Sequence, residues 1–164
     1  MKYLLDSNTF IEAKNRYYGM SFCPGFWSWI QSEYLQQNIA SIESVFEELK
    51  RGDDELADWA LDNSQLFLPV SDHQTQACFG EIASLVASEA PKYKEGAVEL
   101  FMSGADPWLI AKAKTLNAVV VTHEAFNLET KKKVLIPNVC RSVGVSFIDT
   151  FALLNLLEAK FVLE

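Results

Sequence analysis

Tyr3-Leu4-Leu5-Asp6-Ser7-Asn8-Thr9-Phe10-Ile11 is a short apolar run that ends on an acidic residue and passes into a helical pattern. Ser7 and Asn8 are residue types that favour helix caps, and apolar residues recur at helical spacing after them as far as Tyr17. The stretch therefore predicts a strand that ends at Asp6, followed directly by a helix. Because open α/β sheets bind ligands at the carboxyl ends of their strands, Asp6 is the first candidate for a functional residue.

The composition is that of an ordinary folded protein. The chain has 164 residues, of which 49% are hydrophobic and 22% are charged, so residues 1–164 are expected to form one domain with a core of its own. Its three cysteines are far apart in the sequence, and it has only two histidines. This pattern argues against a zinc site and fits a reducing compartment.

Neither end of the chain predicts a membrane segment. Asp6 interrupts the first apolar run, so we expect no signal peptide. The apolar stretch 143–163 is interrupted by Asp149, Asn155, Glu158 and Lys160, so we expect no membrane span there. The sequence thus predicts a soluble, cytoplasmic protein.

The net charge of −8 opposes nonspecific binding to nucleic acid, because that affinity comes mainly from lysine and arginine. Any contact with nucleic acid must therefore be local. The candidate basic patches are Lys14 with Arg16, Lys50 with Arg51, Lys112 with Lys114, and the run 131–133. For each of them the alternative is a solvated surface.

Short apolar segments alternate with helical patterns along the chain. Further strands are predicted at 39–42, 66–70, 118–122 and 145–148, and helices are predicted after each turn signal, with the last from about 150 to 160. Pro137 is interpreted as a turn. The predicted fold class is α/β: a single-domain three-layer sandwich with a central parallel sheet of four to five strands and helices on both faces.

Three further acids fall near strand ends. Glu48 follows the 39–42 strand and lies close to the apolar stripe of its helix, Asp106 precedes a proline at a helix start, and Glu124 comes two residues after the 118–122 strand. Each has a structural alternative: Asp6 and Asp106 as helix caps, and the two glutamates as solvated acids. For Asp106 the two roles are compatible, because one oxygen can cap while the other faces a ligand.

Taken together, these four acids return to one edge of the predicted sheet. Carboxylates crowded there would repel one another unless a cation lay among them. Ligands that are all oxygen favour Mg²⁺ or Mn²⁺, which suit the hydrolysis of phosphodiesters. Asp6, Glu48, Asp106 and Glu124 are thus the candidate catalytic and metal-binding residues, and Asn8 and Thr122 are candidates to contact the substrate or to support the acids.

Four segments together resemble the PIN domain, in order and over nearly the whole chain. The first is the predicted strand together with Asp6, Ser7 and Asn8 at its end. The other three are the segments 45–52, 105–111 and 120–124. The segment 136–140 is similar to a poorly characterised bacterial and archaeal branch of PIN-like proteins.

This resemblance implies a parallel sheet covered on both faces and a Mg²⁺- or Mn²⁺-dependent ribonuclease. The family's acids match Asp6, Glu48, Asp106 and, in the place of a usual aspartate, Glu124; Glu47 is an alternative for the second position. Because glutamate is longer than aspartate, ligation by Glu124 through water is an alternative to direct ligation.

The resemblance also implies partners. Many PIN proteins are toxins of toxin-antitoxin modules that cut RNA and are silenced by an antitoxin protein, and many are homodimers. We therefore expect an RNA substrate, an antitoxin and a homodimer. The aromatic segment 26–34 is a candidate partner surface, and the alternative for its aromatic side chains is the core. The region 53–103 is longer than in small members of the family.

Two other functions compete with the ribonuclease. One is a binding module with the PIN fold and weak or no catalysis, which the net acidity and Glu124 favour. The other is a phosphatase with Asp6 as its nucleophile. Such phosphatases usually have a second aspartate two residues later, where this chain has Asn8.

Overall fold

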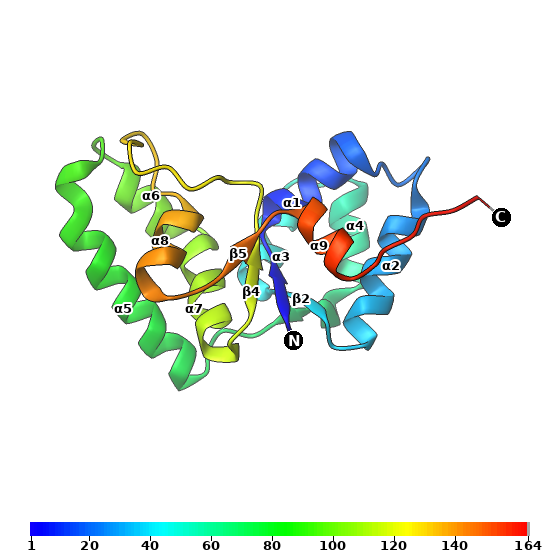
Figure 1. The fold of residues 1–164 in the computed structure, drawn as a ribbon, viewed down its shortest axis with the longest axis horizontal. Helices are drawn as coiled ribbons and strands as arrows, with labels where there is room; N and C mark the ends of the chain where they lie inside the picture. Colours follow the sequence, from blue (N-terminus) through cyan, green and yellow to red (C-terminus); the bar gives the residue numbers. More distant parts are fainter. Residues whose placement is uncertain (164) are drawn as a thin grey trace.

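The centre of the structure, a computed structural model that describes residues 1–163, is a sheet of five parallel strands (Figure 1). The strands are β1 (Tyr3–Leu5), β2 (Ile39–Ile42), β3 (Phe67–Leu68), β4 (Val119–Val121) and β5 (Phe147–Ile148), in the order β3-β2-β1-β4-β5. The chain builds outward from β1 in one direction and then returns to add β4 on its other side. The topological switch point, where open α/β sheets bind ligands, therefore lies between β1 and β4.

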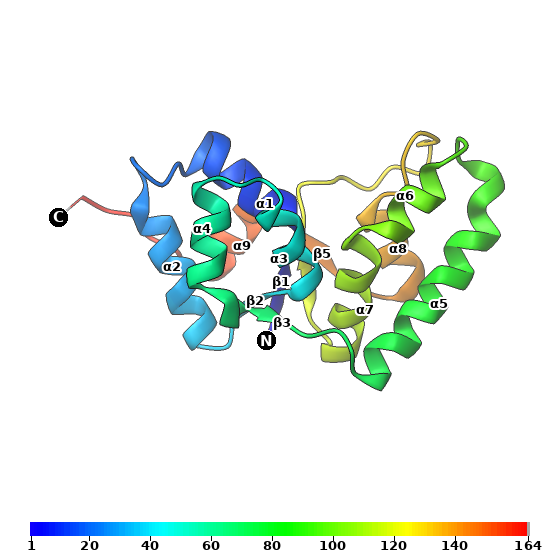
Figure 2. The same cartoon turned by 180° about the vertical axis from the view of Figure 1, so that it is seen from behind.

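Helices cover both faces of this sheet, as the sequence predicts (Figures 1 and 2). One layer holds α5 (His73–Glu89), α6 (Ala97–Ser103), α7 (Asp106–Leu116) and α8 (Ile136–Val143). The other holds α1 (Ser7–Glu12), α2 (Pro24–Leu35), α4 (Glu55–Asp62) and α9 (Thr150–Leu156). Helix α3 (Glu43–Lys50) follows β2 at the carboxyl edge and contacts both α1 and α7. The predicted α/β sandwich is confirmed.

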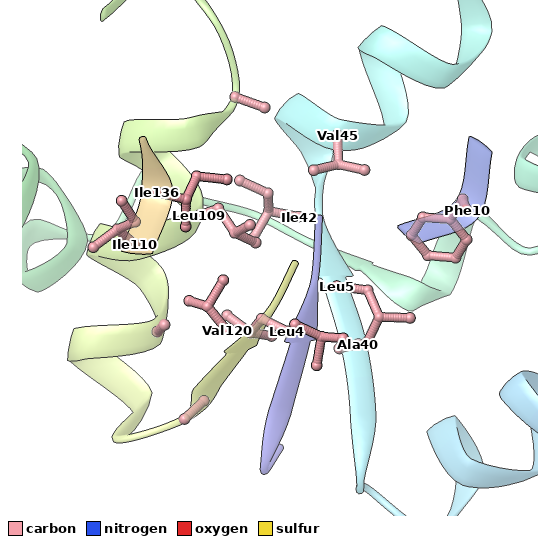
Figure 3. Packing of buried hydrophobic residues seen from close by; sticks show 14 of the residues in the cluster. Leu4, Leu5, Phe10, Ala40, Ile42, Val45, Leu109, Ile110, Val120 and Ile136 are labelled. Carbon is pink, nitrogen blue, oxygen red and sulfur yellow. The ribbon is translucent and has the colours of Figure 1, made fainter. Parts of the chain in front are cut away.

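The core lies on both sides of the central strands. Leu4 and Leu5 of β1 are 0% and 1% exposed, as expected for a parallel strand that is covered on both faces. Figure 3 shows Ile42 with residues of α7 and α8 on one side of the strands and Phe10 of α1 on the other. The two layers thus fix β1 and β4 rigidly, and with them the residues that follow these strands.

The region 53–103 joins the sheet to its outer layer. It contains α4, the short helix η2 (Ser64–Leu66), strand β3, the long helix α5, the short helix η3 (Ala90–Lys92) and α6. Asp72 accepts a hydrogen bond from Thr75 N and so caps α5. Helix α5 packs mainly against α7, whose first residue is Asp106.

Several local predictions are wrong. Ser7 and Asn8 do not cap the first helix, because α1 begins at Ser7 and Asp6 occupies the cap position. After Glu12 the chain continues as the π-helix η1 (Ala13–Tyr17). Pro137 is not in a turn: it lies in the first turn of α8, where its missing N–H costs nothing. Strands β3 and β5 are two residues long, shorter than predicted.

The aromatic segment 26–34 is largely part of the core. Phe26 and Trp27 are 1% and 4% exposed, and Ile30 is fully buried, so these side chains are not available to a partner. For these residues the core alternative is confirmed, and the prediction of a partner surface is wrong. Within residues 1–163, every helix is too short or too polar to cross a bilayer.

Candidate active site

The four predicted acids come from four elements that meet at the carboxyl edge of the sheet. Asp6 follows β1, Glu124 follows the neighbouring strand β4, Glu48 lies in the helix after β2, and Asp106 begins α7. The charges of Glu48, Asp106 and Glu124 all act on Asp6. The structure therefore brings these side chains together at the switch point between β1 and β4.

Asp6 is the most deeply buried of the four, with 2% of its surface exposed. Its backbone N–H donates to Val121 O at 3.0 Å, which aligns the end of β1 with β4. Its Oδ2 accepts a hydrogen bond from Thr122 Oγ1 at 3.1 Å. Asp6 occupies the cap position of α1, but its carboxylate makes no capping hydrogen bond. The side chain therefore faces the acid cluster and not the helix.

Asp106 does not cap α7, contrary to the local sequence pattern. Ala105 holds the cap position, and Asp106 is the first helical residue, with Pro107 after it. Within residues 1–163 the half-buried Asp106 carboxylate has no hydrogen-bond or ion-pair partner among the side chains and amides. Its oxygens therefore remain available to a ligand.

Glu48 connects three elements. Its Oε1 accepts a hydrogen bond from Ala105 N at 2.9 Å, and its Oε2 accepts one from the Ser7 hydroxyl. Glu47, the alternative for this position, is exposed and forms an ion pair with Lys50 at 3.2 Å. Glu48 is therefore the acid of α3 that faces the cluster.

Glu124 is held on the N-terminus of α8. Its Oε2 accepts a hydrogen bond from Ile136 N at 2.7 Å, and its Oε1 pairs with Lys133 Nζ at 2.5 Å. Its own backbone N–H donates to Thr122 Oγ1 at 3.2 Å. Thr122 thus links Asp6 to Glu124 through its hydroxyl, and its role in supporting the acids stays a prediction.

Burial and mutual repulsion dominate the electrostatics of the cluster. The pKa of Asp6 is raised from 3.8 to about 8, first by burial and then by the charges of Asp106 and Glu124. The pKa of Asp106 is raised to about 7 by burial and by Glu124, whereas the ammonium of Lys133 opposes this rise. The cluster therefore holds more negative charge than its own cation balances.

Sequence reasoning missed two residues that organise this cluster. The sequence predicts Ser7 as a cap, but its hydroxyl donates a hydrogen bond to Glu48. It predicts Lys133 only as part of a basic patch, but this lysine pairs with Glu124. Pro137 was a usable signal, because proline in a first helical turn implies free amides just before it. Asn8 is exposed, and its predicted contact with substrate stays a prediction.

The donor set fits a hard divalent cation in its chemistry, because all four side chains offer carboxylate oxygens. Nevertheless, no three Asp, Glu, His or Cys residues of the described range 1–163 are grouped to hold a metal ion as they stand. The reason lies in Glu48 and Glu124, whose oxygens are directed to Ser7, Ala105 N, Lys133 and Ile136 N. Asp6 and Asp106 are therefore the two acids of the cluster whose oxygens are least engaged by protein groups, although the charge of Lys133 acts on Asp106.

Comparison with known proteins identifies a family and a fold. The sequence model of the family described as "Domain of unknown function (DUF4411)" matches residues 3–161. No curated protein matches the sequence.

Three solved structures are similar over nearly the whole chain. FitAcB from Neisseria gonorrhoeae has a TM-score of 0.53 and 19% identity, and the match covers 89% of this chain and 96% of that one. VapBC-1 from nontypeable Haemophilus influenzae has a TM-score of 0.52 and 19% identity, with 91% and 98% covered. FitAB bound to the IR36 DNA fragment has a TM-score of 0.50 and 17% identity, with 90% and 94% covered. At these identities the similarity establishes the fold, which is that of PIN domains.

Proposed function

The chain belongs to the DUF4411 family, and we propose that it is a Mg²⁺- or Mn²⁺-dependent ribonuclease that hydrolyses RNA phosphodiesters. The observation that carries this proposal is the convergence of Asp6, Glu48, Asp106 and Glu124 at the switch point of a PIN-like sheet. A site built only to stabilise the fold would not gather three further carboxylates around a buried aspartate with a single lysine to balance them.

Asp6 and Asp106 are the residues that would bind the cation directly, because their carboxylates are the least engaged with protein groups. Mg²⁺ usually binds one or two carboxylates and keeps several waters, so Glu48 and Glu124 would act through water. When bound, the divalent ion would activate a water for attack on the phosphorus and stabilise the leaving oxygen.

The remaining residues position these acids. Thr122 Oγ1 orients the Asp6 carboxylate. The Ser7 hydroxyl and Ala105 N hold the Glu48 carboxylate in place. Ile136 N, at the N-terminus of α8, holds the Glu124 carboxylate in place through a hydrogen bond to its Oε2. Lys133 is half exposed, and its ammonium is placed to neutralise a phosphate that approaches Glu124.

The biological role that we propose is the toxin of a toxin-antitoxin module, silenced by an antitoxin protein, with the chain acting as a homodimer. The resemblance to PIN domains supports this role, as does the similarity of the fold to FitAcB and VapBC-1. A neighbouring gene that encodes a small DNA-binding repressor would support it further.

The test is cleavage of single-stranded and structured RNAs by the purified protein, with Mn²⁺ or with chelator. We expect cleavage only with the metal ion, and we expect Asp106→Asn to abolish it. Asp62→Asn is the matched control, because Asp62 is an exposed acid at the end of α4. Cleavage that persists in chelator, or that survives Asp6→Ala, would contradict the proposed chemistry.

A second function, a PIN-fold binding module without catalysis, is favoured by one observation. The Lys133 ammonium already pairs with Glu124 and so supplies part of the missing positive charge. In that case the acids would bind no divalent ion. Calorimetric titration with Mn²⁺ separates the two functions, since a binding module would give the same heats for the wild type and Asp106→Asn.

A further inference from the structure

A groove lies between three segments on the side of α5 and α8. It consists of two adjoining hollows of about 450 and 250 Å³, which share Lys92, Tyr93, Leu128 and Thr130. One wall is the end of α5 with the residues before α6, and the other is the loop after β4 together with α8. In Figure 1 this loop passes from the end of β4 toward α6 and α8. Because Glu124 follows β4 and the loop residues 128–131 line the groove, the loop joins the acid cluster to the groove.

The groove is locally basic on an acidic protein. Four cationic side chains line it, Lys92, Lys94, Lys131 and Arg141, against two acids, whereas the whole chain carries a net charge of −8. Lys92 pairs with Glu89 at 3.7 Å, but within residues 1–163 the other three cations have no ion-pair partner. Unpaired cations gathered in a hollow create a positive potential that attracts a polyanion.

Aromatic rings lie among these cations. The Arg141 guanidinium lies over the Phe126 ring, 4.2 Å from its centroid, and Tyr93 lines both hollows. This contact holds the guanidinium in place while leaving its N–H groups free to bind a phosphate. Rings and guanidinium planes are also the surfaces on which unstacked bases pack.

The loop that forms one wall is fixed at both of its sides. Lys94 N donates to Lys131 O at 2.7 Å, which ties the loop to the segment before α6. Asn138 of α8 accepts from Asn127 N at 3.0 Å and donates to Asn127 O at 2.8 Å. The groove is therefore formed before any ligand binds, which reduces the entropic cost of binding.

The same loop joins the groove to the acid cluster. Phe126 lies two residues after Glu124, and Lys133, two residues after Lys131, pairs with Glu124. Since successive Cα atoms are about 3.8 Å apart, the Cα atom of Phe126 lies within about 8 Å of that of Glu124, so the groove begins beside the proposed cleavage site.

We propose that this groove binds single-stranded RNA, with phosphates on Lys94, Lys131 and Arg141 and unstacked bases against Phe126 and Tyr93. The choice of RNA rests on the proposed function, because the groove leads to the acids of that site. The groove explains how a strongly acidic chain retains a polyanion beside four carboxylates. It also gives Lys131, the first lysine of the basic run 131–133, a role in binding RNA, whereas the alternative is a solvated surface with no such role.

The test is equilibrium binding of a fluorescent 12-nucleotide single-stranded RNA in chelator, followed by anisotropy. The groove variant is Lys131→Gln with Arg141→Gln, and the matched control is Lys2→Gln with Lys160→Gln, two exposed lysines outside the groove. We expect the groove variant to bind at least about tenfold more weakly and to lower the slope of log K against log salt by about 1.4, near 0.7 per lost phosphate contact. The control should change Kd by less than about twofold.

A third variant tests stacking apart from charge. Tyr93, which lines both hollows, is the ring to change, because Phe126 also holds Arg141. Tyr93→Leu should weaken binding of the single strand about tenfold and leave duplex RNA unaffected, and Tyr93→Phe should restore binding, because every base stacks on an aromatic face. A variant that had merely unfolded would lose binding of both RNAs.

The outcomes separate the groove from the nuclease. If the groove and control variants weaken RNA binding equally, or if neither weakens it, the proposal that the groove binds RNA is overturned. Groove variants that bind RNA normally but lose a protein partner also overturn it and assign the surface to that partner. Groove-dependent RNA binding without Mn²⁺-dependent cleavage would overturn the proposed nuclease and support the groove.

Discussion

Asp6 and Asp72 show how differently one protein treats two aspartates. Asp72 caps α5 and accepts hydrogen bonds from Thr75 N and Thr75 Oγ1, each at 2.9 Å, while Lys112 Nζ lies 2.8 Å from its Oδ2. These contacts hold the pKa of Asp72 far below its usual range, and the hydrogen bond with Lys112 has the largest effect. Asp6 has one hydroxyl partner and three neighbouring carboxylates, and its pKa is raised to about 8.

The difference separates a structural acid from a candidate functional one. The protein supplies Asp72 with its own cation and amide, so this acid needs nothing from solution. It gives Asp6 a buried position among three like charges, which Lys133 balances only in part, so that a proton or an external cation is needed for the rest. Each prediction below tests whether this contrast reflects function.

The largest expected effect is on catalysis. Asp106→Asn should lower the Mn²⁺-dependent rate of RNA cleavage by more than about a hundredfold, because loss of a mere supporting partner at a metal site already costs about 10- to 100-fold. Cleavage rates under single-turnover conditions measure it. A rate within tenfold of the wild type, with Asp62→Asn as the control, would remove Asp106 from the site.

The pH dependence of stability should differ between the two aspartates. Folding raises the pKa of Asp6 from 3.8 to about 8, so between these values the unfolded chain releases a proton that the folded chain keeps. The contribution of Asp6 to the free energy of unfolding therefore falls as pH rises through this window. Folding lowers the pKa of Asp72, so its contribution is present above the unfolded value and is lost only as pH falls toward the folded one.

Asp6→Asn should remove the loss of stability that the ionised Asp6 carboxylate causes at high pH. In chelator we expect it to raise the free energy of unfolding at pH 8 by about 2 kcal/mol or more, roughly 4 to 8 °C in Tm, and to have little effect at pH 4. Urea unfolding at a series of pH values measures this change. A gain that does not grow with pH would show that the acids do not repel one another.

A smaller effect is expected at Thr122, which is 1% exposed and bonds Asp6. Thr122→Val keeps the shape but removes the hydroxyl, so we expect cleavage to slow about tenfold and the free energy of unfolding to fall by about 1 kcal/mol. Thr122→Ser should restore both. If serine fails to rescue cleavage while stability returns, Thr122 acts only on the fold.

The smallest effect should separate the two glutamates of α3. Glu47→Gln should leave cleavage within about twofold of the wild type, because exposed residues away from the site contribute little. Glu48→Gln should slow cleavage at least about tenfold, since Glu48 holds Ser7 and Ala105 N. The reverse ranking, measured in the same assay, would show that Glu47 is the functional acid.

Much of the fold follows from apolar runs and their spacing. The 39–42 strand was predicted with its observed bounds, because four buried residues in a row read clearly as a central strand. The edge strands β3 and β5 are shorter than predicted, since their pairing depends on a neighbour and not on their own sequence. The π-helical turn after Glu12 has no signal in the residues themselves.

The site was predictable in its members but not in its contacts. Strand ends identified the positions of Asp6 and Glu124, and helix periodicity favoured Glu48. The partners Ser7 and Lys133 come from contacts across 41 and 9 residues, which no local pattern encodes. Local capping rules misassigned Asp106, because Ala105 takes the cap position and its N–H is already held by Glu48.

The most direct test of the central claim is calorimetric titration of the wild type, Asp106→Asn and Asp62→Asn with Mn²⁺ at pH 8. If the crowded acids form a cation site, the wild type and Asp62→Asn will bind Mn²⁺ with the same isotherm, and Asp106→Asn will bind at least about tenfold more weakly. Equal isotherms for all three proteins, or no heat from the wild type, would contradict the account.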